Sequence, residues 1–381
     1  MQQVYFDNAA TTPMRDEVID AISEVMKNNF GNPSSSHSFG RSSKSLVEKS
    51  RKSIAQHLNV AASEIIFTSG GTEADNFVLH SAINNLSVRH IITSKIEHHA
   101  VLHPVEKLEK DSRIRVSYVD LDAKGNIDFK HLESLLQTDT KTLVSLMHIN
   151  NEIGNILDLK RVSNLCQANN ALFHTDAVQS VGHYYIDLQT IPIDFISASA
   201  HKFHGPKGIG FVFIKKNSGL KPIIIGGEQE RGLRAGTENV PSIVGMETAL
   251  NIAFKNLEEE IEYLKELKQY FIQKCIAQIP NIAFNGNSVD FELSSHTLIN
   301  LRLPLDEDKA AMILFHLDLK GVACSRGSAC QSGSSKKSHV LSEILKDKDL
   351  QKPSLRFSFS IFNTKEEVDY VINVLKGMVI N

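Results

Sequence analysis

A lysine near the end of a strand-like run is the first candidate for chemistry in this sequence. Residues 197–208 read SASAHKFHGPKG, in which a β-rich run ends in small residues before His201, Lys202 and a Gly-Pro turn. Burial at such a strand end lowers the pKa of a lysine and frees its amine to form a Schiff base with a carbonyl group. The small neighbours leave room for a flat cofactor ring. A surface turn that carries two lysines is the alternative for this segment.

An acidic residue closes the apolar run that precedes this segment. Residues 174–180 read HTDAVQS and place Asp176 at the end of a predicted strand. Ligands of open α/β sheets bind outside the carboxyl ends of the strands. A carboxylate at that place can keep a pyridine nitrogen protonated, which makes the ring an electron sink. The alternative is that Asp176 caps the next helix.

Two glycines between a strand and a helix form the third candidate. Residues 68–76 read TSGGTEADN. Free N–H groups at a helix start, together with the hydroxyl of Thr72, can hold a phosphate group. No Gly-Lys-Ser or Gly-Lys-Thr follows, so this is not a Walker loop. A tight turn without a ligand is the alternative.

Adjacent histidines, His98 and His99, follow Glu97. Neighbouring side chains on one segment point apart, and no Glu-x-x-His spacing accompanies them, so the pattern does not predict a metal site. One imidazole can stack on a planar ring, and the alternative is an interior histidine without a ligand.

A cysteine lies in a stretch rich in glycine and serine. Cys330 belongs to SRGSACQSG at 325–333, and Arg326, Lys336 and Lys337 lie near it in the sequence. Cationic neighbours favour the thiolate, and exposure makes a thiol reactive. Cys330 is therefore either a nucleophile or an incidental thiol.

An arginine interrupts an apolar strand-like run near the C-terminus. Arg356 lies in SLRFS at 354–358 and needs an anionic partner there. Its planar guanidinium matches a substrate carboxylate, and a structural salt bridge is the alternative. One cofactor chemistry requires a Schiff-base lysine, a pyridinium carboxylate, a phosphate cradle and such an arginine together.

Alternating strands and helices must position these residues. The regular alternation predicts a mostly parallel α/β sheet with helices on both sides. The last two strands are joined by about nine residues, so one of them is expected to run antiparallel. The predicted strands are Ile65–Thr68, His90–Ser94, Arg115–Asp120, Thr142–Ile149, Ala171–Asp176, Asp194–Ser199 and Ile209–Ile214. The predicted helices are Glu73–Leu86, Ala100–Lys110, Asp128–Leu136 and Asp158–Asn169.

The pattern changes after Pro241. Apolar residues every three or four positions predict one long helix over Met246–Ile279, which bridges two domains. A smaller α+β pattern follows it, with expected elements at Thr297–Leu303, Lys309–Leu317 and Ser354–Ser360 and after Thr364. We expect a large domain over 15–255 and a small domain formed by 1–14 and 256–381. The small domain carries a mobile loop at about 325–338.

Composition excludes several classes of protein. The 381 residues are 41% hydrophobic and 22% charged with a net charge of −3, so neither disorder nor non-specific binding of nucleic acid or anionic lipid is expected. No apolar run approaches the roughly 18 residues that span a bilayer. Cys166, Cys275, Cys324 and Cys330 are too sparse for a disulfide framework or a zinc site. The start of the chain lacks a secretory signal pattern, and we expect a cytoplasmic protein.

Nearly the whole chain resembles the cysteine desulfurases of the class V, fold-type-I family that depends on pyridoxal 5′-phosphate. Nine motifs in the order of that family carry the resemblance: YFDNAATTP (5–13), GNPSSSHSFG (31–40), FTSGGTEADN (67–76), MHINNEIG (147–154), HTDAVQS (174–180), SAHKFHGPKGIG (199–210), ERGLRAGT (230–237), SRGSACQSG (325–333) and LRFSFS (355–360). The resemblance implies a large domain with a mostly parallel seven-stranded sheet flanked by helices, and a smaller α+β C-terminal domain.

The resemblance also implies a pyridoxal 5′-phosphate site. Lys202 would form the Schiff base, Asp176 would pair with the pyridinium nitrogen, and His98 would stack on the ring. Asn151 and Gln179 would bond the phenolic side of the ring. The phosphate would be held by Gly71, Thr72, Ser199, His201 and the partner subunit's copy of Thr237, which implies a homodimer.

The implied reaction converts L-cysteine to L-alanine. Cys330 would accept the sulfur as a persulfide, with Lys202 moving protons. Arg356 would bind the substrate carboxylate, with Asn8 and Asn32 nearby. An acceptor protein would take the sulfur for iron–sulfur clusters, thio-cofactors or tRNA thiolation, without direct contact to nucleic acid or membrane. The alternatives are a selenocysteine lyase, a cysteine-sulfinate desulfinase, another class V aminotransferase, or a non-catalytic carrier on the same scaffold.

Overall fold

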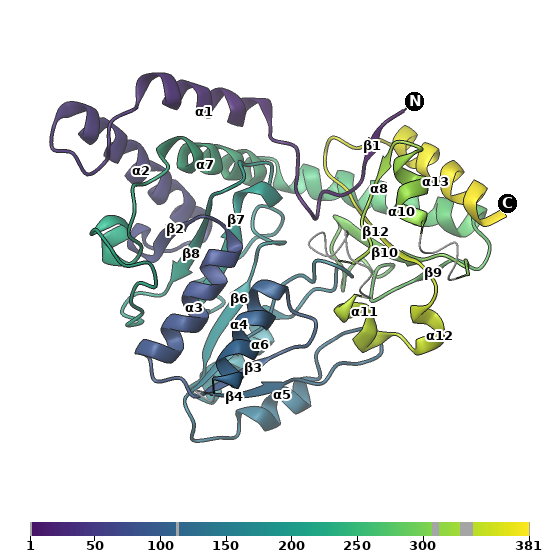
Figure 1. Ribbon diagram of the computed structural model, residues 1–381, viewed down its shortest axis with the longest axis horizontal. Coiled ribbons are helices and arrows are strands. Elements are labelled where there is room, and N and C mark those ends of the chain that lie inside the picture. The colour runs from purple at the N-terminus through teal and green to yellow at the C-terminus, as the bar shows by residue number, and fades with distance from the viewer. Residues whose placement is uncertain (1, 112–113, 307–311, 328–337, 381) are drawn as a thin grey trace.

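A seven-stranded sheet forms the centre of the larger part of the molecule (Figure 1). The computed structural model describes residues 2–111, 114–306, 312–327 and 338–380. In spatial order the strands are β2 (Ile65–Thr68), β8 (Gly210–Ile214), β7 (Phe195–Ser199), β6 (Leu172–Asp176), β5 (Thr142–Ser145), β3 (His90–Thr93) and β4 (Arg115–Tyr118). Neighbours from β7 to β4 run parallel, whereas β8 runs antiparallel to both β7 and β2. The predicted sheet and its one reversed strand are therefore confirmed.

Helices cover both faces of this sheet, because alternate strand residues point to opposite sides. Within β2, Ile66 packs against α3 (Gly71–Asn85) and α4 (His99–Lys110), whereas Ile65 and Phe67 belong to the core on the other face. The helices on that second face are α1 (Asp16–Asn28), α2 (Ser38–His57), α5 (Phe129–Leu136), α6 (Leu159–Ala168) and α7 (Val240–Lys255). Figure 1 shows α3 and α4 together in front of the strands.

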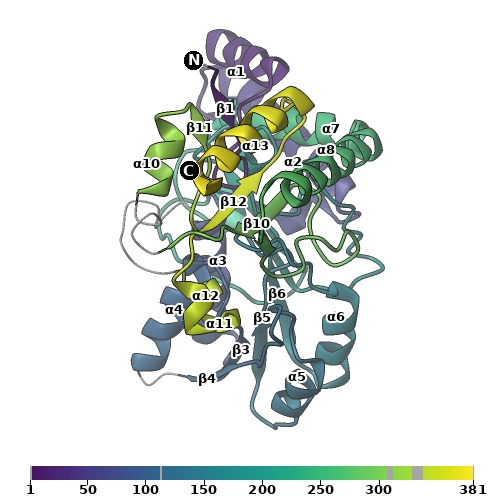
Figure 2. The same ribbon diagram turned by 90° about the vertical axis from the view of Figure 1, so that its right-hand side faces the viewer.

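A second core lies beside the first (Figure 2). It contains an antiparallel sheet in the order β12 (Ser354–Ser358), β10 (Leu298–Arg302) and β9 (Ala283–Phe284), which packs with α8 (Leu257–Gln278) and α13 (Lys365–Ile380). The N-terminal strand β1 (Val4–Tyr5) joins this part by pairing in parallel with β11 (Val322–Ala323). Helix α10 (Ile313–Asp318) also packs in this core, whereas α11 (His339–Ile344) and α12 (Asp347–Leu350) belong to a separate apolar cluster with Ile96 and Ile153.

The predicted long helix Met246–Ile279 is wrong, because the chain forms α7 and α8 with a break at Asn256. Asn256 has φ −107° and ψ 11°, outside the helical range. Its N–H still bonds Ile252 and its carbonyl still accepts from Glu260, so the apolar spacing continues across the bend. The residues of α7 enter the first core, and most of the buried residues of α8 enter the second. The division into domains 15–255 and 256–381 with 1–14 stays a prediction.

Among the described helices, none combines the length and the apolar character that crossing a bilayer requires. The first residues of the predicted helix Lys309–Leu317 lie outside the described ranges, and its later part belongs to α10.

Candidate active site

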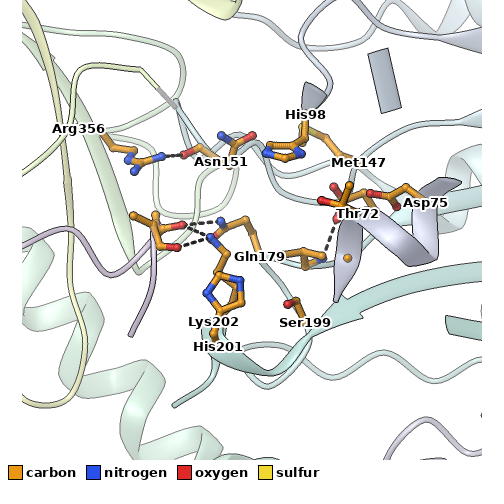
Figure 3. Close-up of a pocket in the computed structure, with 15 residues that line it drawn as sticks. Thr72, Asp75, His98, Met147, Asn151, Gln179, Ser199, His201, Lys202 and Arg356 are labelled. Atoms are coloured by element: carbon orange, nitrogen blue, oxygen red, sulfur yellow. Dashed lines mark hydrogen bonds between the residues drawn. The ribbon is translucent and has the colours of Figure 1, made fainter. Parts of the chain in front are cut away.

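One pocket collects side chains that follow the carboxyl ends of five strands (Figure 3). Its volume is about 200 Å3. Gly71 and Thr72 follow β2, His98 follows β3, Met147 and Asn151 follow β5, Asp176 ends β6, and Ser199 ends β7. The parallel strands bring these separate segments to one edge of the sheet, where open α/β sheets bind their ligands.

Lys202 ends a short 3-10 turn, Ala200–Lys202, directly after β7. Its side chain lines the pocket, so the segment is not the surface turn that was the alternative. Its Nζ donates hydrogen bonds to the carbonyls of Ala9 at 2.5 Å and Ala10 at 2.8 Å. The two carbonyls hold the amine at one place. The Lys202 carbonyl lies 2.9 Å from Nε2 of His183, which helps to fix the turn itself.

Asp176 ends β6, and the segment after it, residues 178–183, forms turns rather than the helix that the capping alternative required. Oδ1 of Asp176 accepts a hydrogen bond from the Val178 N–H at 2.9 Å, and the same residue lines the pocket. Burial raises the pKa of Asp176 to about 7, and the nearby carboxyl group of Asp75 contributes to the shift. A cationic group bound beside Asp176 would restore its negative charge.

The geometry of the predicted phosphate cradle explains why glycines occupy positions 70 and 71. A Cβ placed on Gly71 would lie 2.5 Å from Val178 Cγ2, so a larger residue would have to displace the wall of the pocket. Gly70 has φ +152°, which side chains rarely allow. The N-terminus of the 15-residue helix α3 therefore faces the pocket with Thr72, and Ser199 and His201 complete this side.

His98 is the N-cap of α4 and lines the pocket. Its Nδ1 accepts a hydrogen bond from the Ala100 N–H at 3.1 Å. Burial and the positive charge of Lys202 lower the pKa of His98 to about 4, so the ring is neutral and carries its proton on Nε2. His99 turns elsewhere, as expected, and its ring lies 4.5 Å from that of His103 and 4.4 Å from that of His339.

Arg356 lies at the other end of the pocket, on β12 (Figure 3). Its Nη2 forms an ion pair with Asp7 at 2.9 Å, and its Nη1 donates to the Asn151 carbonyl at 2.7 Å. Its Nε is buried without a hydrogen-bond partner among the described residues. The salt bridge that sequence reasoning left as an alternative is present, and the guanidinium nevertheless remains part of the pocket wall.

Gln179 and Asn151 also line the pocket, and the Gln179 amide donates to the Ala9 carbonyl at 3.0 Å. Three predicted residues do not line it in this chain. Asn8 is buried, and its amide bonds the Ser358 carbonyl at 2.8 Å. Asn32 and Thr237 are exposed. Their substrate and cofactor contacts stay predictions.

Cys330 lies outside the described residues, but both flanking segments reach the Arg356 end of the pocket. Before it, Ser325 exchanges two backbone hydrogen bonds with Arg356 and donates its hydroxyl to Asp7 at 2.8 Å. After it, the hydroxyl of Ser338 donates to Glu152, the residue next to Asn151. A Cβ on Gly327 would lie 3.2 Å from Ser338 Cβ, so the two ends are close together.

Sequence reasoning missed Asp75 and the backbone of Ala9 and Ala10, which also line the pocket. Asp75 lies in the same TEADN segment as Thr72, one helical turn on, and that spacing is the signal that could have found it. No sequence pattern marks the Ala9 and Ala10 carbonyls, because backbone acceptors are common to all residues.

Comparison with known proteins gives a consistent result across the chain. Cysteine desulfurase IscS of Dictyoglomus turgidum is 43% identical over 380 residues, covering 99% of this chain and 95% of that protein. Putative cysteine desulfurase IscS 1 of Bacillus subtilis is 43% identical over 99% of this chain and 100% of its own length. A solved structure titled NifS-like protein has a TM-score of 0.91 and 34% identity, with full coverage of both chains.

A cysteine desulfurase from Thermococcus onnurineus, solved in its apo form, has a TM-score of 0.87 with 23% identity over 99% of this chain and 95% of its own, which shows the fold alone. The sequence model described as Aminotransferase class-V matches residues 4–371. With this match over nearly its full length, the chain belongs to the class-V aminotransferase family.

Proposed function

We propose that this chain is a cysteine desulfurase that uses pyridoxal 5′-phosphate and converts L-cysteine to L-alanine. One observation carries the proposal: a single pocket unites the amine of Lys202, the carboxyl of Asp176, the start of α3 and the guanidinium of Arg356. The names of the relatives, cysteine desulfurase IscS at 43% identity, support the same activity.

The pocket residues fit this cofactor. The helix N-terminus at Gly71, with Thr72 and Ser199, suits a phosphate dianion. Asp176, whose pKa is raised by burial, suits a protonated ring nitrogen. Lys202 suits the aldehyde carbon, and the neutral ring of His98 can stack on a planar ring without adding charge. Asn151 and Gln179 would bond its phenolic side, and His201 would assist at the phosphate.

In the proposed reaction, Arg356 binds the substrate carboxylate through its guanidinium, which lines the pocket and is held by Asp7 and the Asn151 carbonyl. The bound cofactor supplies an electron sink for the substrate α-carbon. Lys202 takes a proton from that carbon and returns one later as a general base and acid. The Cys330 thiolate attacks the substrate sulfur, the C–S bond breaks with its electron pair kept by carbon, and a persulfide forms on Cys330. Protonation of the carbon product gives alanine.

The role of Cys330 separates this proposal from the related activities. Selenide and sulfinate leave without a thiol acceptor, so only a cysteine desulfurase needs this residue. Cys330→Ala should abolish alanine formation from L-cysteine and leave turnover of L-selenocysteine, with Cys324→Ala as the matched control. Unchanged activity of Cys330→Ala on L-cysteine would overturn the assignment. A purified chain without the absorbance of a bound cofactor would instead favour a non-catalytic carrier.

We also propose a homodimer in which the partner subunit's Thr237 completes the phosphate site. Thr237 is exposed in its own chain, as are large apolar side chains such as Ile225 (88%) and Phe30 (73%). Mixed dimers of Lys202→Ala and Thr237→Ala subunits should contain one intact pocket and recover activity. No recovery would place Thr237 in its own chain's site. Delivery of sulfur to an acceptor protein for iron–sulfur clusters or thiolation, in the cytoplasm, completes the proposal.

A further inference from the structure

A second aspartate lines the same pocket and has no part in the reaction described so far. Asp75 lies on α3 and is 1% exposed. Figure 3 shows its side chain beside Thr72 and Met147, on the opposite side of the view from Arg356. Like Asp176, it is a carboxyl group removed from water at the inner end of the pocket.

Among the described residues, no lysine or arginine forms an ion pair with Asp75. Its Oδ1 has no hydrogen-bond partner among the described residues, and its nearest basic atom is Nε2 of His174, 3.4 Å away. The buried His174 ring contacts the hydroxyls of Ser145 at 2.9 Å and Ser197 at 3.1 Å. Burial lowers the pKa of His174 to about 4, so this ring is neutral near pH 7 and cannot offset a carboxylate.

The other elements packed on α3 add no cation either. Strands β2, β7 and β8 read IIFT, FISAS and GFVFI and contain no titratable side chain. At the start of α4, His98 is neutral. Glu97, just before it, is buried between Ser94 and the Met147 N–H, and burial raises its pKa to about 8. Two buried carboxyl groups, Asp75 and Asp176, therefore line the pocket, and the buried Glu97 lies near both of them.

The two aspartates are not equivalent as anions. Asp176 accepts the backbone N–H of Val178 and is favoured by the positive charge of Lys202. Among the described residues, Asp75 accepts from the hydroxyl of Ser197, and its Oδ1 has no donor. A carboxylate is stabilised by each hydrogen bond that it accepts, so a single shared proton belongs on the aspartate with fewer donors.

We infer that Asp75 and Asp176 share one proton at the floor of the pocket, with Asp75 holding it, so that one negative charge faces the bound ring nitrogen. Burial raises the pKa of both groups to about 7, and two interacting carboxyl groups in one site lose their protons in two separate steps. This inference rests on the proposed function for its consequence and makes Asp75 a positioning residue. A second ionised carboxylate there would change the charge that the ring nitrogen meets.

Carbon-13 NMR of the full-length chain with its cofactor bound, labelled at the aspartate carboxyl carbon, reads each protonation state directly. Asp75→Asn and Asp176→Asn assign the two signals, and Asp75→Glu supplies the assignment if Asp75→Asn does not fold. At about pH 6 the wild-type Asp75 signal should have the shift of a protonated acid and the Asp176 signal that of a carboxylate. An ionised Asp75, or a protonated Asp176, at this pH would overturn the inference. Glu97 carries no label and does not interfere.

Activity gives a second readout that a purely structural role would not produce. Asp176→Asn removes the carboxylate that faces the ring nitrogen and should lower kcat near pH 7 by about a hundredfold or more, a larger loss than that of Asp75→Asn, which keeps a neutral group. The wild-type profile should fall above about pH 7 as Asp75 ionises, and the Asp75→Asn profile should lack this limb. Identical profiles would contradict the inference. Cofactor absorbance in the same samples tests the proposed function separately.

Discussion

Arg51 and Glu230 form a buried ion pair that anchors strand β2 below the pocket. The guanidinium of Arg51 meets both oxygens of Glu230, at 2.6 and 2.8 Å, and both side chains are 2% exposed. Arg51 also donates to the Ile65 carbonyl at 2.8 Å, and Glu230 accepts the Phe67 N–H at 2.8 Å. The pair therefore joins α2, β2 and the loop that leads to Thr237. We predict that Arg51→Met severely destabilises the protein.

The expected magnitude follows from the burial. The substitution removes two charge-assisted hydrogen bonds to Glu230 and a third to the exposed Glu48 at 3.1 Å. Among the described residues, the Glu230 carboxylate then keeps only the Phe67 N–H as a donor. Breaking such a pair by removing one partner costs about 3–5 kcal/mol, because an uncompensated charge stays buried. Both side chains are only 2% exposed, so water screens the attraction between their charges very little. The loss is large beside the roughly 5–15 kcal/mol of a typical folded protein.

Arg231→Met is a matched control, because Arg231 also pairs with a glutamate, Glu48, at 2.9 Å, but the two side chains are 38% and 45% exposed. An exposed pair contributes about 0–1 kcal/mol. Urea unfolding followed by circular dichroism should show a much lower midpoint for Arg51→Met and almost no change for Arg231→Met. Equal shifts in the two variants would refute the reasoning. A double variant, Arg51→Met with Glu230→Met, should recover part of the lost stability, because it also removes the buried carboxylate that Arg51→Met leaves unpaired.

Three further predictions concern the pocket and the second core. Gly71→Ala should weaken cofactor binding about tenfold in an absorbance titration, because the new Cβ would lie 2.5 Å from Val178 Cγ2. Burial lowers the pKa of Lys268 from 10.5 to about 7, so the unfolded chain binds more protons between these values. The thermal midpoint of the wild type should therefore rise relative to that of Lys268→Met from about pH 7 to about pH 9.5, and a constant difference would contradict this. Arg356→Lys should raise KM for L-cysteine more than it lowers kcat, because Lys cannot replace a planar two-point donor.

Much of the large sheet could be predicted from the sequence, because its strands are buried on both faces. Buried strands such as Phe195–Ser199 are apolar along nearly their whole length, and this pattern is local. The positions of Lys202, Asp176 and Gly71 followed from the same pattern, since each comes at or just after a strand end. The reversed strand was predictable because nine residues are too few for a crossover helix.

Other features required the tertiary structure. Asn256 breaks a helix without interrupting the apolar period, so spacing alone could not locate the bend. The Ala9 carbonyl that holds Lys202 lies 193 positions away in the chain, and the Asp7 carboxylate that pairs with Arg356 lies 349 positions away.

The sequence by itself determined which residues can do chemistry and the strand ends from which they project, because burial and strand termination leave local patterns. Only the tertiary structure decided which charged groups meet, as Arg356 does with Asp7. Backbone acceptors and pairs of side chains that are distant in the sequence leave no periodic pattern in it. Their interactions can therefore be identified only in the folded chain.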